Sequence, residues 1–351
     1  MQPIDQSLLS SLKPSFVTRR VDHGDIGWLD EGAGGLAAGD LVVARVEEIG
    51  QHTRIERPDG RRAHLFLGDQ ILLACGARYA PDQFEADCPT AVGPANLAAA
   101  GGIAGLVRLS HGQMKPATAL TIRGALHNRD GLRMNVAQYG LSASVRPLGI
   151  PLIVICGTAM NAGKTHSVAS LVRGLVRAGQ RVAAIKATGT GAGGDLWLFR
   201  DSGAHHVRDF TDAGFATTYR APVEAIFAGL CRLASDAEAA GAEVVVMELA
   251  DGLFQHETAG LLAMERFRAM LTAVVFAAGD AMGAQSGAAW LKQAGLPVRA
   301  VSGCLTRSPL AMREAAAVVE LPCLGSEALE TAAVASRLIE AQAAPPVLTA
   351  A

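Results

Sequence analysis

A segment with phosphate-binding chemistry lies in the middle of the chain, in PLIVICGTAMNAGKTHSVASLVRGLV at 151–176. An apolar run enters a glycine-containing turn, and Lys164 and Thr165 open an amphipathic helix. In such loops backbone N–H groups cradle phosphate oxygens, a lysine reaches the outer phosphates and a hydroxyl binds Mg²⁺. We therefore predict a catalytic role for Lys164 and a metal-binding role for Thr165. The residues expected to bind the cofactor here are Gly157, Thr158, Asn161, Ala162, Gly163, Lys164, Thr165 and His166.

The spacing of this loop is unusual. Gly157 and Gly163 are six positions apart, one more than the common G-x-x-x-x-G-K-[ST] pattern allows. The alternative to a phosphate site is a tight strand–helix turn with an exposed Lys-Thr pair.

Two carboxylates follow a later apolar run, VVVMELADG, at Glu248 and Asp251. In open α/β sheets ligands gather at the carboxyl ends of the strands. We expect both residues to be catalytic, with Glu248 also holding Mg²⁺ through water and Asp251 facing the acceptor. The alternative is that they cap the next helix.

The segment 186–219 is polar, rich in glycine and long for a plain connection. Such loops inside compact domains are usually functional or disordered. Asp195 supplies the oxygen ligand that Mg²⁺ prefers. Asp209 and Asp212 are either ligands or helix caps, and the adjacent His205 and His206 point in different directions, which disfavours a shared metal.

The elements that position these residues change in type along the chain. From Pro151 onward, apolar runs alternate with helical stretches, a pattern typical of a mainly parallel sheet with helices on both faces. The helices are expected at 164–178, 222–240, 259–271, 285–295 and 308–317.

Residues 37–147 instead predict a small β-rich domain, because short β-type runs flank turns such as Pro58-Asp59-Gly60. We expect one helix there, in the alanine-rich stretch 93–109. The loop CGARYAPDQFEA holds Arg78 in a polar cluster, either to grip an anionic substrate or to stabilise a corner. The expected division is a lead-in at 1–36, the β-rich domain at 37–147 and a phosphate-loop domain at 148–345.

Composition limits the function classes. Half of the 351 residues are hydrophobic, 18% are charged and the net charge is −2, so a sizeable core is expected and no nucleic-acid or anionic-membrane surface is indicated. The six cysteines show no C-x-x-C pair and no zinc-like spacing, and we expect them to be small buried thiols. We find no convincing signal peptide and no apolar run long enough to span a membrane, and expect a cytoplasmic protein.

The motif G-T-x(4)-G-K-T at 157–165 resembles the loop of dethiobiotin synthetase and its relatives in the SIMIBI class. That resemblance, over about 150–328, implies a catalytic Lys186 facing the phosphates in AAIKA, a Mg²⁺-binding Asp195, and Ser302 and Gly303 contacting the purine. The departure is at Glu248-Leu-Ala-Asp251-Gly252, where the family has EGAGG. A second resemblance is to a poorly characterised bacterial P-loop family that includes a D-glutamate N-acetyltransferase.

We expect an enzyme that uses ATP and Mg²⁺ to activate a small carboxylate or amine metabolite, of kinase or ligase type. One alternative is a CoA-dependent N-acyltransferase of an amino acid, with the loop holding the CoA phosphates. Another is an NTPase adaptor in cofactor assembly. The expected partner is a small-molecule substrate, with no nucleic acid and no membrane, and the family resemblance implies a homodimer.

Overall fold

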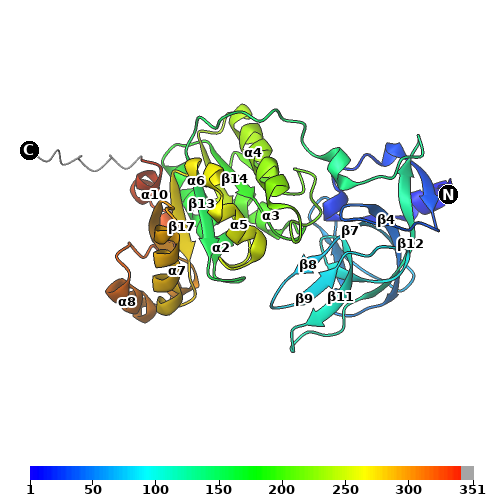
Figure 1. Cartoon of the computed structure of the whole chain (residues 1–351), viewed down its shortest axis with the longest axis horizontal. Helices are drawn as coiled ribbons and strands as arrows, with labels where there is room; N and C mark the ends of the chain where they lie inside the picture. The colour runs from blue at the N-terminus through cyan, green and yellow to red at the C-terminus, as the bar shows by residue number, and fades with distance from the viewer. Residues whose placement is uncertain (341–351) are drawn as a thin grey trace, which may run out of the picture.

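The computed structural model describes residues 1–340 and shows two parts, each built on its own sheet (Figure 1). Residues 341–345 of the expected phosphate-loop domain lie outside the described residues. Among residues 1–340, no helix is long and apolar enough to cross a membrane. The six cysteines are free thiols; Cys75, Cys156 and Cys231 are buried, as predicted, whereas Cys88, Cys304 and Cys323 are only partly buried.

The N-terminal part, called the β domain below, consists of short strands. They are β1 (Gln2–Pro3), β2 (Lys13–Pro14), β3 (Ile26–Asp30), β4 (Leu41–Glu48), β5 (Arg54–Glu56), β6 (Arg62–His64), β7 (Gln70–Cys75), β8 (Arg78–Tyr79), β9 (Phe84–Asp87), β10 (Gly93–Ala99), β11 (Ile103–Ser110) and β12 (Ala119–Asn128). The helical turns are α1 (Gln6–Ser11), η1 (Phe16–Thr18), η2 (His23–Asp25) and η3 (Val136–Tyr139). Residues 1–36 contribute three strands to the main sheet.

Five of these strands close into a ring. Hydrogen-bonded pairs run from β12 to β4, β7, β11 and β10, and from β10 back to β12. All of these pairs are antiparallel except β7–β11, which is parallel. Closing a small sheet into a ring removes its edges, and side chains fill the interior. The predicted turn at Pro58-Asp59-Gly60 is confirmed, since it joins the antiparallel pair β5 and β6. The β8–β9 hairpin extends from the ring beside β11.

The helix expected at 93–109 is wrong: these residues form β10, a turn and β11. Gly102 has φ +114°, a conformation that favours glycine and turns the chain back on itself. Leu97 and Ile103 are fully buried, so tertiary packing against the neighbouring strands outweighs the helix preference of the alanines.

The C-terminal part, called the P-loop domain below, confirms the predicted α/β class with a mainly parallel sheet. Its strands are β13 (Leu152–Gly157), β14 (Val182–Lys186), β15 (His206–Asp209), β16 (Val244–Glu248), β17 (Ala273–Ala277) and β18 (Val298–Ser302). They lie in the order β15-β14-β16-β13-β17-β18, and all neighbours are parallel. The edge strand β15 was not predicted, because it is short and contains polar residues.

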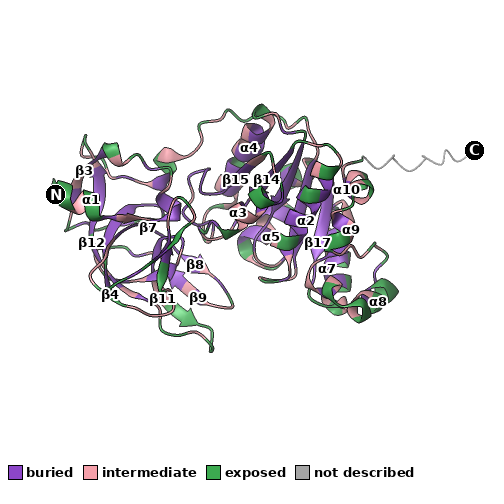
Figure 2. Ribbon diagram, turned by 180° about the vertical axis from the view of Figure 1, so that it is seen from behind, coloured by how far each residue is buried: buried purple, intermediate pink, exposed green. Residues whose placement is uncertain are grey.

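Helices cover both faces of this sheet. They are α2 (Lys164–Arg177), α3 (Gly194–Asp201), α4 (Val223–Ala239), α5 (His256–Ala263), α6 (Glu265–Ala269), α7 (Ala281–Gln293), α8 (Pro309–Val318), α9 (Ser326–Leu329) and α10 (Ala332–Ile339), with the turn η4 (Cys304–Arg307). The central strands β13, β16 and β17 are buried throughout, while the helices expose their outer faces (Figure 2). Alternate residues of β13 face opposite cores, with Val154 in one hydrophobic cluster and Ile155 in the other.

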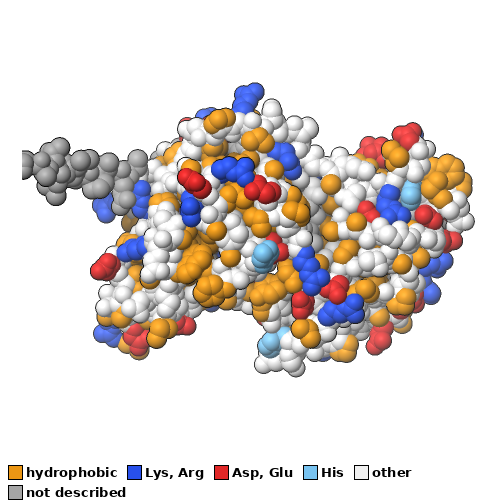
Figure 3. Space-filling model, viewed as in Figure 1, with side chains coloured by type: hydrophobic (Ala, Val, Ile, Leu, Met, Phe, Trp, Pro, Cys, Tyr) orange, Lys and Arg blue, Asp and Glu red, His pale blue; other side chains and the backbone are white. Residues whose placement is uncertain are grey.

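Several polar contacts join the two domains beside the P-loop. The Asn161 side chain donates to Asp82 Oδ2 at 2.8 Å, Tyr219 Oη donates to Glu85 at 3.0 Å, and Arg220 pairs with Asp87 at 2.5 Å. The β-domain partners all belong to the β8–β9 hairpin (78–87). On the face in Figure 3, side chains of both signs are interspersed where the two domains meet.

Candidate functional site

The strand β13 ends directly in the predicted loop, and α2 begins at Lys164. Gly163 has φ +95°, and a Cβ there would lie 2.9 Å from Cys304 N, so the loop requires glycine at this position. Lys164 is only 6% exposed, and its Nζ donates to the carbonyls of Ala159 at 2.7 Å and Asp251 at 2.8 Å. The loop thus carries a buried ammonium group at a helix N-terminus, the arrangement that binds phosphate.

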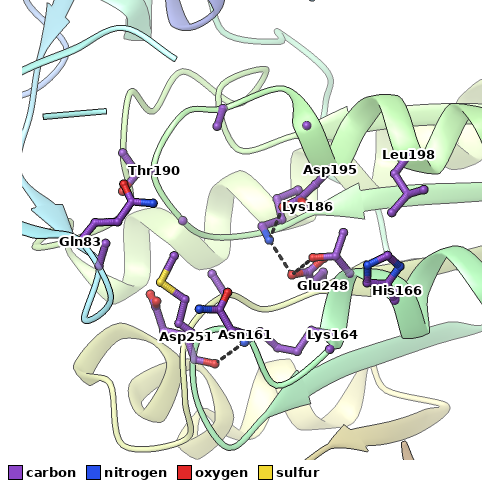
Figure 4. Close-up of a pocket in the computed structure, with 18 of the residues that line it drawn as sticks. Gln83, Asn161, Lys164, His166, Lys186, Thr190, Asp195, Leu198, Glu248 and Asp251 are labelled. Atoms are coloured by element: carbon purple, nitrogen blue, oxygen red, sulfur yellow. Dashed lines mark hydrogen bonds and ion pairs between the residues drawn. The ribbon is translucent and has the colours of Figure 1, made fainter. Parts of the chain in front are cut away.

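Three ionisable side chains meet beside this loop. Lys186, at the end of β14, places Nζ 2.5 Å from Asp195 Oδ2 and 2.5 Å from Glu248 Oε1 (Figure 4). Thr165 Oγ1 donates to the same Glu248 oxygen at 3.2 Å. Strand β16 pairs with β14 so that Lys186 lies opposite Glu248, which explains how residues 62 positions apart meet. We call Thr165, Lys186, Asp195 and Glu248 the carboxylate cluster.

Burial and the ion pairs within the cluster together set the pKa values of its three ionisable side chains. Burial opposes the charge on Lys186, but Asp195 and Glu248 raise its pKa above the ordinary value. Burial also opposes the charge on Asp195, yet Lys186 and the Thr165 hydroxyl lower the pKa of that carboxyl. Glu248 is 1% exposed, and burial raises its pKa in spite of Lys186. Two carboxylates share one ammonium group, so the fully ionised cluster carries one net negative charge.

The carboxylate cluster fits a magnesium ion. Its donors are a hydroxyl and two carboxylates, all oxygen, as Mg²⁺ prefers. Glu248 Oε2 is buried and has no hydrogen-bond partner, although such atoms are nearly always paired in proteins. Within residues 1–340 there is no group of three or more His, Cys, Asp and Glu placed to hold a metal. Any ion here would therefore need phosphate and water oxygens to complete its coordination.

The cluster and the loop open into a cavity of about 760 Å³ between the two domains. This volume lies within the range usual for small-molecule sites. The P-loop domain contributes Asn161, His166 and Asp251 besides the residues above, and the β domain contributes Arg62, Arg78, Tyr79 and Gln83. Gln83 lies on the β8–β9 hairpin, across the cavity from Lys186 and Glu248 (Figure 4).

Two residues of the cavity wall have a backbone conformation that is uncommon outside glycine. Asn161 has φ +65° and Asp251 has φ +61°. Conformations of this kind cost free energy and cluster at functional sites. Burial raises the pKa of Asp251. Asp251 does not cap the next helix; Gln255 does, accepting from Thr258 N at 3.0 Å.

Some expected site residues lie elsewhere. Thr158 borders a separate apolar pocket beside α7, and Gly157 and Ala162 are buried and do not line the cavity. Ser302 is buried and its hydroxyl lies 3.0 Å from that of Ser167, so the structure does not bring it to the cavity. Gly303 packs its backbone against Ala162, where a Cβ would lie 2.4 Å from the carbonyl oxygen. The neighbouring Cys304 and Arg307 line the cavity instead.

The ambiguous polar residues of 186–219 have structural partners. Asp209 pairs with Arg19 at 3.0 Å and accepts from Thr211 N at 2.8 Å, and Asp212 pairs with Arg19 at 2.8 Å. His206 pairs with Asp236 at 2.7 Å. None of these residues lines the cavity; the aspartates instead hold the β domain against the P-loop domain.

Sequence reasoning missed the residues that reach the cavity from distant elements. Arg62 begins β6 in the β domain, whereas Thr190 and Arg307 belong to the P-loop domain. No local motif marks them: the docking of the two domains brings Arg62 to the cavity, and the fold of the P-loop domain brings Thr190 and Arg307 there.

No protein-family model matches the chain, and no curated protein matches it in sequence. In all, 112 chains of solved structures match. They include the cell division protein FtsY from Thermotoga maritima (16% identity, TM-score 0.34, covering 58% of this chain and 74% of that one). They also include the signal recognition particle 54 kDa protein from Aeropyrum pernix in complex with GDP (19%, 0.35, 58% and 50%). A third is the signal recognition particle receptor FtsY from Elizabethkingia anophelis (15%, 0.31, 48% and 53%).

This chain therefore spans about half the length of the Aeropyrum and Elizabethkingia proteins. Similarity this weak carries no information on function, which has to come from the residues of the site.

Proposed function

We propose that this protein is an enzyme that uses a magnesium–nucleotide complex to activate a small metabolite, in the manner of a kinase or ligase. The observation that carries this proposal is the carboxylate cluster beside the P-loop, at the wall of a cavity that both domains line. Two carboxylates and a hydroxyl at this place suit Mg²⁺ held with nucleotide phosphates.

Each residue has a definite task in this proposal. Lys164 and the loop amides bind the outer phosphates, and Thr165, Asp195 and Glu248 would hold the metal. Bound Mg²⁺ would neutralise charge that develops on the phosphate oxygens. Lys186, already fixed by two carboxylates, orients them and offers its ammonium group toward the phosphates. Phosphoryl transfer depends mainly on positioning and electrostatics, so this set of groups suffices.

We propose ATP as the nucleotide, since the sequence contains no N-K-x-D motif of the kind that reads guanine. The carboxylates next to Thr165 favour a metal-bound triphosphate over the phosphates of coenzyme A. The two other functions considered from the sequence, acyl transfer and an NTPase adaptor, become outcomes of the test below.

The test is thermal unfolding of the full chain with ATP, GTP or acetyl-CoA, each with and without Mg²⁺. At 100 times its Kd a ligand adds about 2.7 kcal/mol of stability. We expect stabilisation by ATP that requires Mg²⁺ and disappears in Lys164→Ala. The matched control is Lys292→Ala, whose side chain is 46% exposed and far from the site in sequence.

Stabilisation by acetyl-CoA alone, independent of Mg²⁺, would overturn the proposal in favour of acyl transfer. Nucleotide hydrolysis that needs a protein partner and consumes no small molecule would favour the adaptor. An ATP response that survives Lys164→Ala would place the nucleotide elsewhere.

A further inference from the structure

Arg78, on the β-domain side of the cavity, is a buried cation without an ion pair. Within residues 1–340, Lys164 and Arg78 are the two least exposed lysine and arginine residues, at 6% and 7%. Neither pairs with a carboxylate in the described part of the chain; their contacts are with carbonyl, amide and imidazole groups. A buried charge is costly unless it is paired. In the function proposed above, a phosphate supplies the negative charge that Lys164 lacks. Arg78 lines the same cavity and lacks a negative partner too.

The contacts of Arg78 hold the guanidinium group but leave part of it free. Nη1 donates to Ala98 O and lies 3.3 Å from His52 Nε2, and Nη2 donates to Gln83 Oε1 at 2.9 Å. Nε is buried and has no partner. Nε–H and the second N–H of Nη2 therefore remain, a pair of donors suited to the two oxygens of a carboxylate.

The neighbouring carboxylates compensate this charge only in part, because neither forms an ion pair with Arg78. Asp82 and Asp251 both favour the charged guanidinium through space, and Asp82 also accepts from Asn161 at 2.8 Å. Burial lowers the pKa of Arg78 to about 10, which still leaves it charged at neutral pH. The cavity wall as a whole carries five lysine and arginine side chains against three carboxylates, so it favours anions.

The β8–β9 hairpin, which begins at Arg78, has a fixed position relative to the P-loop. Its residue Asp82 is hydrogen-bonded to Asn161 within the loop, and Gln83 both contacts Arg78 and lines the cavity. A group bound to Arg78 would therefore lie opposite the phosphates at a distance set by the protein.

We infer that Arg78 binds a carboxylate group of the second substrate, so that the metabolite activated by this enzyme is an organic acid held between the two domains. Gln83 is a positioning residue that orients the guanidinium group. This inference rests on the function proposed above, because the bound acid is a substrate only if the protein is such an enzyme. The anion site at Arg78 can be tested separately.

The experiment measures the unfolding temperature of the full chain saturated with Mg·ADP, which occupies the P-loop. The probes are succinate, acetate and inorganic phosphate, each compared with chloride at equal ionic strength. The variants are Arg78→Gln, Arg78→Lys and, as a matched control, Arg123→Gln. Arg123 lies on β12 with a side chain 46% exposed and paired weakly with Glu31 at 3.7 Å.

We expect succinate or acetate to raise the unfolding temperature of the wild type, and the control to respond equally. Arg78→Gln should lose the response. Arg78→Lys should keep the fold and bind the probe at least about tenfold more weakly, because lysine lacks the two-pronged geometry. If Arg78→Gln does not fold, the lysine variant decides the question.

Succinate, acetate and inorganic phosphate are also added, without nucleotide, to Lys164→Ala, the variant that lacks the lysine of the P-loop. If Mg·ADP has no effect on the wild type but the carboxylate response still needs Arg78, the anion site stands and the nucleotide proposal falls. An equal response in Arg78→Gln, or no carboxylate response in the wild type, overturns the inference. Stabilisation by phosphate alone would replace the carboxylate with a phosphate group and overturn the assignment to an organic acid.

Discussion

Lys186 is the residue whose removal gives the sharpest test of the carboxylate cluster. Its side chain is 13% exposed and contacts Asp195 and Glu248, and the Glu248 side chain is 1% exposed. Lys186→Met keeps the volume of the aliphatic stem but leaves two carboxylates without their counterion. Removing one partner of a buried ion pair costs about 3–5 kcal/mol, and we expect a loss of that size in the free energy of unfolding.

The pH dependence of this loss has a definite sign. Burial already raises the pKa of Glu248, and without Lys186 the ionised carboxylate is still less stable in the folded state. The penalty exists only where Glu248 ionises in the unfolded chain, which is above its ordinary pKa of 4.5. The difference between the variant and the wild type should therefore shrink as the pH is lowered toward that value.

The assay is urea unfolding followed by circular dichroism at several pH values. Adding Glu248→Gln to Lys186→Met should restore most of the lost stability, because the more deeply buried of the two uncompensated carboxylates is then neutral, while Asp195 is 33% exposed. The control is Lys292→Met, an exposed lysine 3.8 Å from Glu320, which should cost less than about 1 kcal/mol. A loss below about 1 kcal/mol in Lys186→Met, or no recovery in the double variant, would refute the reasoning.

Three further predictions concern the cavity and its supports. Burial and Arg78 lower the pKa of His52 from 6.5 to about 4. Between pH 7 and pH 5 this histidine is protonated in the unfolded chain but not in the folded one, so the free energy of unfolding should fall by about 2 kcal/mol. Urea unfolding of His52→Gln should lack that slope, and an unchanged slope would contradict the assignment. Gly163→Ala should abolish stabilisation by nucleotide, because its Cβ meets backbone within 3.0 Å, whereas Gly179→Ala has open space and should retain it. Asp82→Ala should speed hydrogen exchange in the β8–β9 hairpin by removing its 2.8 Å bond to the P-loop; unaltered exchange would show that other contacts hold the hairpin.

Local sequence was sufficient for the elements that carry their own pattern. The central parallel strands are marked by their apolar runs. Around the segment 157–165, a strand, a loop and the start of a helix follow one another within one short stretch. The acidic residues after β16 were recognisable for the same reason, since they follow a buried strand directly. Turn chemistry likewise revealed the β5–β6 hairpin, because an Asp-Gly pair between two β-type runs favours a tight turn.

Tertiary structure decided what depends on partners distant in sequence. The stretch 93–109 forms strands because they close a ring with β7 and β12, and β-pairing of this kind is stabilised by neighbours that no local pattern reveals.

The same reason explains the site: Lys186 is fixed by a carboxylate 62 positions away, and Arg78 belongs to the cavity only because another domain docks there. The chain's own residue types therefore determined the loop and the helix that it opens, whereas the charges that surround the loop are brought together by sheet pairing and by the packing of two domains.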